Sequence, residues 1–234
     1  MRLFPTEDWL DEYARRLDES AALDDLAAGW GADFNGDVLL VISELPLEET
    51  TLDDLPDVVL EGIPEPIQEG IGELTLADAP SAFGDSLRPS LPAQARELLY
   101  QLETNVTDET IYAYLGLEEG RCTGVETLSK PSDCDVGFVV EGTYRTWQQI
   151  VDGRPALSAM MTGDLRVEGN QLRQLQYSTM FQQLGEVAAG IETTHLFGTE
   201  SRDPANVLFD EAVRQPAFIQ RTAHQQLNRT LKLF

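Results

Sequence analysis

YRTWQQIVDGRPALSAMMTGDLRVEGN, residues 144–170, is the part of the sequence from which most of the fold can be inferred. Apolar residues first recur at helical spacing, and Gly153 can take the left-handed conformation that ends a helix. Pro155 suits the first turn of a second helix, because the N–H that it lacks would have no partner there. After Gly163, apolar and charged residues alternate as far as Gly169, which predicts a half-buried strand.

Four other segments predict strands of the same sheet. Residues 37–43 are apolar on both faces, which is typical of a central, covered strand. Three short strands separated by turns come later and predict an antiparallel meander, at 110–117, 121–128 and 134–141. Together with 164–168, they predict one sheet in which 37–43 is an interior strand.

Helical patterns lie on both sides of these strands. Residues 5–18 place aromatic and leucine side chains on one face of a helix, and a second short helix follows with Ser20 as its cap. Residues 171–189 predict a helical run that breaks near Ser178. Further helical patterns occur at 92–103, 206–213 and 217–230.

Between residues 45 and 108 the composition changes. Prolines and acidic residues interrupt short apolar clusters, so the segment is too apolar for a linker and too broken for a separate domain. We interpret it as an acidic, proline-rich insertion that packs on the main domain without forming a second independent core.

The order of elements carries a resemblance to a known family. A helix of small residues and methionines, a glycine, a strand ending in glycine and a final helix resemble the sterol carrier protein 2 (SCP2) lipid-binding family. The residues at those positions are Ala156, Ala159, Met160, Met161, Gly163, Leu165, Val167 and Gly169. The runs DCDVGFVVE, FPTEDWLDEYARRLDES and DFNGDVLLVI resemble the family's preceding strand, opening helix and first strand. The resemblance covers roughly residues 1–45 and 109–190.

This resemblance implies an α+β fold. The expected sheet is five-stranded, mixed but mostly antiparallel, and covered on one face by helices. The expected domain spans residues 1–190, interrupted by the insertion at about 45–108, and residues 191–234 form an extension packed on the domain or on a partner. In the family, a tunnel between helices and sheet holds lipids or fatty acyl chains. The insertion is unusual for the family and could fill or cover that tunnel.

The resemblance also implies which residues line the tunnel. Periodicity alone would make them ordinary core residues, with methionine as a gap filler. The expected ligand-binding residues are Trp147, Ile150, Val151, Met160, Met161, Leu172, Leu175 and Phe138. Trp30 and Phe34 lie in a turn-rich stretch and have two interpretations: they plug the edge of the core, or they line a ligand entrance.

The formal net charge of −25 indicates the environment more than the activity. The acids are scattered, and the chain has only two lysines, Lys130 and Lys232. This pattern favours the solvated surface of a protein from a high-salt cytoplasm, of halophilic archaeal type, over an acidic face for a basic partner. It argues against binding to nucleic acid or to anionic membranes.

The sequence predicts a cytoplasmic protein that is not an integral membrane protein. No apolar run approaches the length of a membrane-spanning helix, and the N-terminus turns acidic where a signal peptide would be apolar. Cys122 and Cys134 have no metal-ligand spacing, and we expect both to be reduced thiols.

Catalytic motifs are absent from the sequence. His195 and His224 are the only histidines, and neither lies in a metal-binding or nucleophile pattern. Pairs of acidic residues are expected on the surface of so acidic a chain. We therefore expect no enzyme activity, no cofactor and no metal.

Two functions remain. The first is binding or transfer of an apolar ligand: a sterol, an isoprenoid lipid or a fatty acyl chain. The alternative is a structural or protein-interaction subunit whose cavity is filled. A homodimer or a protein partner bound through the insertion or the tail stays open in both cases.

Overall fold

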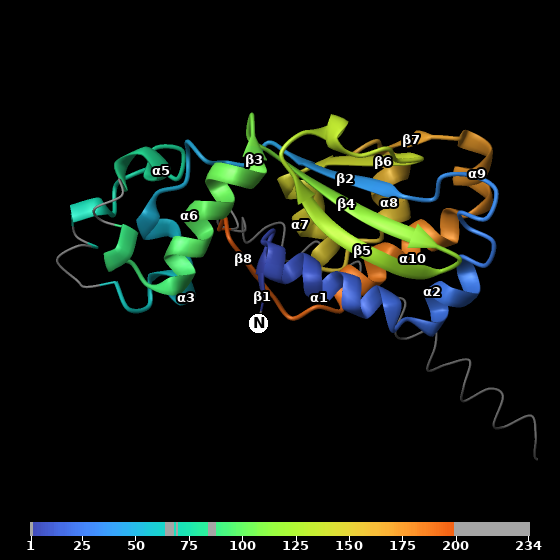
Figure 1. Cartoon of the computed structure of the whole chain (residues 1–234), viewed down its shortest axis with the longest axis horizontal. Helices are drawn as coiled ribbons and strands as arrows, with labels where there is room; N and C mark the ends of the chain where they lie inside the picture. Colours follow the sequence, from blue (N-terminus) through green and yellow to red (C-terminus); the bar gives the residue numbers. More distant parts are fainter. Residues whose placement is uncertain (1, 64–67, 69, 84–87, 199–234) are drawn as a thin grey trace, which may run out of the picture. The chain divides into compact units, whose positions relative to one another are not determined.

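The structure is a computed structural model that describes residues 2–63, 68, 70–83 and 88–198 (Figure 1). All of these described residues belong to one compact unit, 1–198. The predicted helices at 206–213 and 217–230, and His224, therefore lie outside them.

One mixed sheet forms the centre of the described unit. Strand β2 (Val38–Ser43) pairs antiparallel with β4 (Thr110–Glu118) on one side and parallel with β6 (Phe138–Thr143) on the other. Strand β7 (Leu165–Gly169) continues the sheet beyond β6, and β5 (Arg121–Leu128) continues it beyond β4. The prediction that 37–43 is an interior strand is confirmed, and so is the α+β class.

The predicted count of five strands is wrong, because the sheet has six strands among the described residues. The extra strand, β3 (Val106–Thr107), pairs with the first two residues of β4. Asp108 and Glu109 connect the two strands with φ angles of +49° and +55°. Such left-handed pairs form two-residue hairpin turns and usually contain glycine or asparagine, so this turn has no recognisable signal in the sequence.

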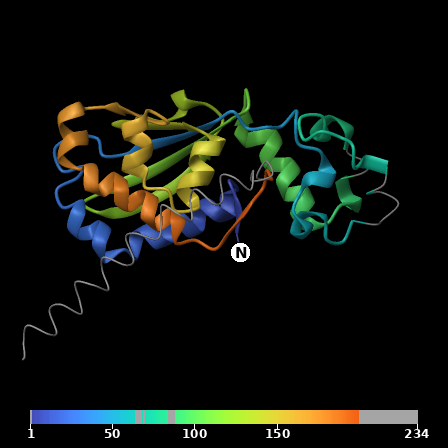
Figure 2. The ribbon, with the colours of Figure 1, turned by 180° about the vertical axis from the view of Figure 1, so that it is seen from behind.

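Helices cover one face of this sheet. They are α1 (Glu7–Asp18), α7 (Tyr144–Val151), α8 (Ala156–Thr162) and α10 (Ser178–Ala189), and α2 (Ala21–Leu26) lies beside α10. In Figure 2 the yellow and orange helices α7, α8 and α10 lie in front of the strands. Leu40 and Ile42 of β2 join the large core on this face. Leu39 and Val41, which point the opposite way, form a small second cluster with Leu128.

Local signals set the ends of the helices that follow β6. The Thr143 side chain accepts a hydrogen bond from the Thr146 N–H at 3.2 Å and caps α7. Gly163, at φ +82°, ends α8 in the left-handed conformation that costs glycine no Cβ contact. Helix α9 (Gln171–Gln176) then follows β7, and Tyr177 leaves helical geometry before α10 starts at Ser178, as predicted.

A second, two-stranded sheet joins the chain's beginning to the end of the unit. Strand β1 (Arg2–Phe4) pairs in parallel with β8 (Thr193–His195). Phe4 packs edge-on against Trp9 and stacks with Tyr144. Residues 191–198, which the sequence assigned to the extension, therefore pack on the domain.

Helices make up most of the described part of the inserted segment. The short ones are η1 (Leu52–Asp54), α3 (Asp57–Leu60), α5 (Ala79–Ala82) and η2 (Arg88–Ser90), and the longer α6 (Ala93–Asn105) follows them. Thr51 and Thr75 form an antiparallel bridge that brings together the two ends of the stretch between these threonines. Buried residues of this segment, such as Leu52 and Leu98, belong to the same continuous cluster as the core of the sheet.

Candidate ligand cavity

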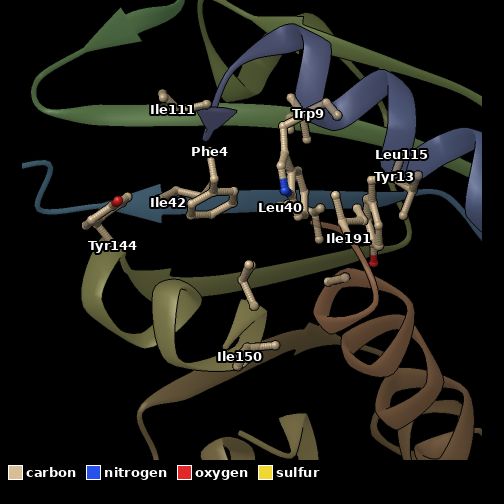
Figure 3. Packing of buried hydrophobic residues seen from close by; sticks show 14 of the residues in the cluster. Phe4, Trp9, Tyr13, Leu40, Ile42, Ile111, Leu115, Tyr144, Ile150 and Ile191 are labelled. Atoms are coloured by element: carbon tan, nitrogen blue, oxygen red, sulfur yellow. The ribbon is translucent and has the colours of Figure 1, made fainter. Parts of the chain in front are cut away.

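An apolar cavity of about 40 Å³ lies between the helices and the covered face of the sheet. Its walls come from the N-terminal segment with α1, from strands β2 and β6, from the start of β7, and from helices α7, α8 and α10. The lining residues are Phe4, Trp9, Leu10, Tyr13, Leu40, Ile42, Val140, Trp147, Ile150, Val151, Ala156, Leu165, Phe181, Leu184, Gly185 and Ala188. Figure 3 shows Trp9, Leu40 and Ile150 extending from α1, β2 and α7 toward this common interior.

The polar atoms of the lining aromatic residues are already hydrogen-bonded within the protein. Trp9 Nε1 donates to Thr193 Oγ1 at 2.9 Å, and Trp147 Nε1 donates to the Val41 carbonyl at 2.9 Å. The Tyr13 hydroxyl donates to the Leu184 carbonyl at 3.1 Å, and burial of this phenol raises its pKa. The cavity therefore presents hydrocarbon and ring faces, a surface that suits an apolar molecule.

Its volume is small for a ligand site. About 10–15 Å³ is enough for one water, whereas pockets for drug-sized ligands are roughly 300–1,000 Å³. A lipid could enter only if the helices moved away from the sheet. The open tunnel expected from the sequence is thus absent from the described residues in this conformation.

Three of the predicted site residues line this cavity. Trp147, Ile150 and Val151 come from the buried face of α7, where the helical spacing placed them. Met160 is half-buried at the margin of the core. Phe138 is buried but does not line the cavity; it packs against Trp30 and against Phe181, which does.

The predicted inward orientation of Met161, Leu172 and Leu175 is wrong. Their exposed fractions are 88%, 74% and 75%, respectively. Helix α8 buries its small side, Ala156 and Ala159, against its neighbours, which turns Met161 outward. Leu172 and Leu175 belong to α9, a six-residue helix in which no residue is buried.

The small side of α8 packs closely against α10. A Cβ atom on Gly185 would lie 2.9 Å from the Ala156 Cβ, so only glycine fits at this contact without a shift. The larger side chains of the cavity wall come from other helices, among them α1 and α7.

Trp30 and Phe34 fit the first of their two interpretations, a plug at the edge of the core. Trp30 is fully buried, its Nε1 donates to the Gly36 carbonyl at 2.7 Å, and its ring contacts Phe34 at 5.1 Å between centroids. Neither residue borders the cavity.

Sequence reasoning missed the contribution of the N-terminal segment and α10 to the cavity wall. The signal was present in the amphipathic pattern of residues 5–18, where Trp9, Leu10 and Tyr13 share one face. That pattern predicts burial without indicating which partner is covered, so the role of these residues emerged only from the tertiary structure.

A second apolar cavity, of about 30 Å³, lies inside the inserted segment. Its lining includes Val59 of α3, Phe83, and Leu98 and Leu99 of α6. All of its wall residues fall between Leu52 and Leu102, so this cavity is built from one continuous stretch of chain.

The described residues hold neither a metal-binding cluster nor a membrane-spanning helix. No group of three or more His, Cys, Asp or Glu side chains there could hold a metal ion. Within the same residues, no helix is both long and apolar enough to span a membrane.

His195 Nε2 lies 2.9 Å from Asp152 Oδ1 and connects β8 to the end of α7. Both cysteines are free thiols.

Comparison with known proteins identifies a family match for part of the chain. Residues 85–182 match the model of the SCP-2 sterol transfer family. The solved structure of a sterol carrier protein 2 is 22% identical, with a TM-score of 0.46 over 80% of this chain and 97% of that one. A protein from Thermus thermophilus described as possibly a sterol carrier protein is 19% identical, with a TM-score of 0.46 over 81% and 90%. No curated protein sequence matches this chain.

Proposed function

We propose that this chain binds and transfers an apolar ligand in the cavity between the helices and the sheet, without catalysing a reaction. The ligand class is a sterol, an isoprenoid lipid or a fatty acyl chain. The observation that carries the proposal is an enclosed apolar cavity whose walls include α7, α8 and β6, all within the residues that match the sterol transfer family.

The chemistry of the walls limits the ligand to an apolar one. Because the ring N–H and hydroxyl groups at the cavity are bonded within the protein, a polar ligand would lose its water partners without replacement. Hydrocarbon gains about 25 cal/mol for each Å² that it buries, so no catalytic or charged group is needed to hold it.

Binding requires the cavity to expand, and we propose that α8 moves to allow it. The helix lies between Gly153 and Gly163, which both have positive φ angles and can absorb a change of direction. Arg154 contacts Asp164 across these two ends, and its guanidinium also donates to Thr162 Oγ1 at 2.9 Å. These bonds hold the two ends of α8 together, so the helix would move as one body.

We further propose that the lipid-binding domain spans residues 1–190, with an acidic insertion at about 45–108 and an extension beyond it. The net charge of −25 with two lysines supports a cytoplasmic protein of halophilic archaeal type. The absence of a cofactor and of enzyme activity remains part of this proposal.

The size of the cavity favours a second candidate function. A volume of about 40 Å³ is also what an imperfectly filled core would leave. In that case the domain is a structural or protein-interaction subunit that has no ligand.

A matched pair of valine changes separates the two candidates. Val140→Leu adds one methylene group to the wall of the domain cavity, and Val59→Leu adds the same group to the cavity of the inserted segment. Each variant of the full chain would be titrated with a fluorescent long-chain fatty acid and then melted. We expect Val140→Leu to raise the dissociation constant about tenfold, since overpacking typically costs about 1–3 kcal/mol when no space is left.

Val59→Leu is the control and should bind like wild type. Equal weakening by both changes would contradict a site in the domain cavity. A wild-type chain that binds no fatty acid, sterol or isoprenoid probe would support the filled-core alternative instead.

A further inference from the structure

Strand β7 lies at an edge of the main sheet with one side unpaired. Among the described residues it pairs with β6 alone (Figure 1). Proteins usually protect such an edge with proline, a bulge, a covering loop, charged side chains or a short strand, because its free N–H and C=O groups can pair with another chain. β7 contains no proline, and its register with β6 runs unbroken from Leu165 to Gly169.

The charges on β7 have a self-complementary order. Arg166 and Glu168 point to the same face of the strand and form an ion pair at 2.8 Å. Their side chains are 70% and 52% exposed. Val167 lies midway between them and packs at the margin of the core.

The exposed apolar side chains lie at the two ends of the same strand. Met161, Leu172 and Leu175 are the most exposed large apolar residues of those described. Met161 belongs to α8, directly before β7, whereas Leu172 and Leu175 belong to α9, directly after it. Within the described residues, packing does not explain why any of these three positions is apolar.

We propose that β7 is the pairing surface for a second copy of this chain, with the two strands antiparallel about Val167. In that register Arg166 of each copy lies opposite Glu168 of the other, so one pairing makes two favourable charge contacts. A twofold interface requires a surface that complements itself, and this order of charges meets that requirement.

The same register accounts for the exposed apolar residues. Antiparallel pairing brings the chain before β7 of one copy beside the chain after β7 of the other. Met161 of α8 in one copy then lies at the same end of the paired strands as α9 of the other copy, which carries Leu172 and Leu175. The twofold axis repeats this arrangement at the opposite end of the paired strands.

The net charge sets the conditions for this dimer. Two chains of charge −25 repel each other over a distance of about 10 Å at 0.1 M salt, and over about 3 Å at 1 M. Charges in contact across paired strands are screened less than charges spread over two surfaces. We therefore expect association to strengthen as KCl rises from 0.1 to 2 M.

Charge reversal on the full-length protein tests the proposal, with sedimentation velocity as the measurement at a KCl concentration where wild type is half dimeric. Arg166→Glu and Glu168→Arg each place like charges opposite one another, and each should weaken the dimer at least about tenfold. The double variant Arg166→Glu/Glu168→Arg restores opposite charges in every contact and should restore the dimer. An equal mixture of the two single variants should form the heterodimer.

Matched controls exclude effects of net charge and of folding. Arg15→Glu and Glu19→Arg reverse the same charges in an exposed ion pair on α1 and should leave association unchanged. Leu172→Ser should weaken the dimer, whereas Tyr100→Ser, at an exposed site on α6, should not. Urea unfolding of each variant would verify its fold.

Three outcomes would overturn the proposal. They are a wild-type monomer at every KCl concentration, a dimer that survives both single reversals, and a double variant that stays monomeric although it is folded. The second outcome would place any dimer contact elsewhere, for instance in the inserted segment.

Discussion

The two apolar cavities of this protein have similar volumes, about 40 and 30 Å³, but they are built in different ways. The walls of the domain cavity come from β1 and α1, from strands β2, β6 and β7, and from α7, α8 and α10. The walls of the cavity in the inserted segment come from one continuous stretch between Leu52 and Leu102. Volume and apolar lining alone therefore do not distinguish a ligand site from a packing gap.

What distinguishes the two is how each could open. The wall of the domain cavity includes α8, a short helix between two glycines of positive φ, which are the hinge positions of the proposed movement. In the inserted segment, the Arg88 guanidinium pairs with Glu103 of α6 and also donates to the Phe83 carbonyl at 2.8 Å. These bonds tie the wall of the second cavity together. The comparison supports ligand entry at the first cavity only.

The largest expected effect is that of salt concentration on the melting temperature. It should involve the sheet domain and the inserted segment together. Because the charge of −25 is spread over the chain, screening by KCl reduces repulsion throughout the fold. We expect the melting temperature to rise steeply between 0.1 and 2 M KCl, in a single calorimetric transition, since buried residues of both regions form one cluster. A melting temperature independent of KCl would contradict this expectation, and two transitions would show that the inserted segment has its own core.

Truncation of one wall residue in each cavity should come next. Ile150→Ala and Leu98→Ala each remove a buried side chain and should cost about 2–5 kcal/mol of the free energy of unfolding, measured in urea. Ile150→Ala enlarges the domain cavity and should keep or improve fatty acid binding, whereas Leu98→Ala should not change it. Leu172→Ala, at an exposed site, is the control and should stay within about 0.5 kcal/mol of wild type. A loss of binding in Leu98→Ala alone would reverse the assignment of the two cavities.

A smaller effect is expected in the pH dependence of stability, to which one carboxyl group in each region contributes. The side chains of Arg15 and Arg16 donate hydrogen bonds to Glu12 on α1 and lower the pKa of its carboxyl from 4.5 to about 2. The contribution of Arg15 is the larger of the two. A hydrogen bond from Arg88 lowers the pKa of Glu103 in the inserted segment. A carboxyl whose pKa is lower in the folded state stabilises the fold above its ordinary pKa, and this contribution is lost as pH falls through the folded value.

Urea midpoints at pH 5.5, 4 and 3 would measure these contributions, in 2 M KCl so that screening suppresses the general relief of repulsion. Both Glu12→Gln and Glu103→Gln should reduce the fall in stability below pH 4.5. For Glu12 the window extends down to about pH 2. A pH profile identical to wild type in either variant would show that its ion pair contributes nothing to folding.

The smallest effect is expected for His195→Ala. His195 borders neither cavity, and its Nε2 contacts only the Asp152 carboxylate among the described side-chain partners. Fatty acid affinity should therefore equal that of wild type, apart from a loss of stability. An assayed turnover that disappears in the folded variant would show that the chain is an enzyme.

The order of elements from α7 to α10 could be predicted from the sequence because the boundaries there have local causes. Gly163 ends α8, Asn170 caps α9 through hydrogen bonds from the Leu172 and Arg173 N–H groups, and Tyr177 separates α9 from α10. The interior position of β2 followed from its apolar residues on both faces. These signals act within a few residues and do not depend on the rest of the fold.

The orientation of the shortest helices could not be predicted in the same way. Leu172 and Leu175 share a face of α9, but their spacing does not say whether that face meets the core or solvent. Met161 follows Met160, so only one of the two can face the core, and the close contact between Ala156 and α10 selects Met160. Such choices depend on tertiary contacts between residues that are distant in the sequence.

Native mass spectrometry of the purified full-length chain, followed by extraction and identification of any retained lipid, tests the central claim most directly. The account predicts that one sterol, isoprenoid or fatty acyl molecule stays bound to each wild-type chain, and that Val140→Leu loses it while Val59→Leu keeps it. A wild-type chain that carries no lipid, and takes up none when mixed with all three classes, would contradict the claim.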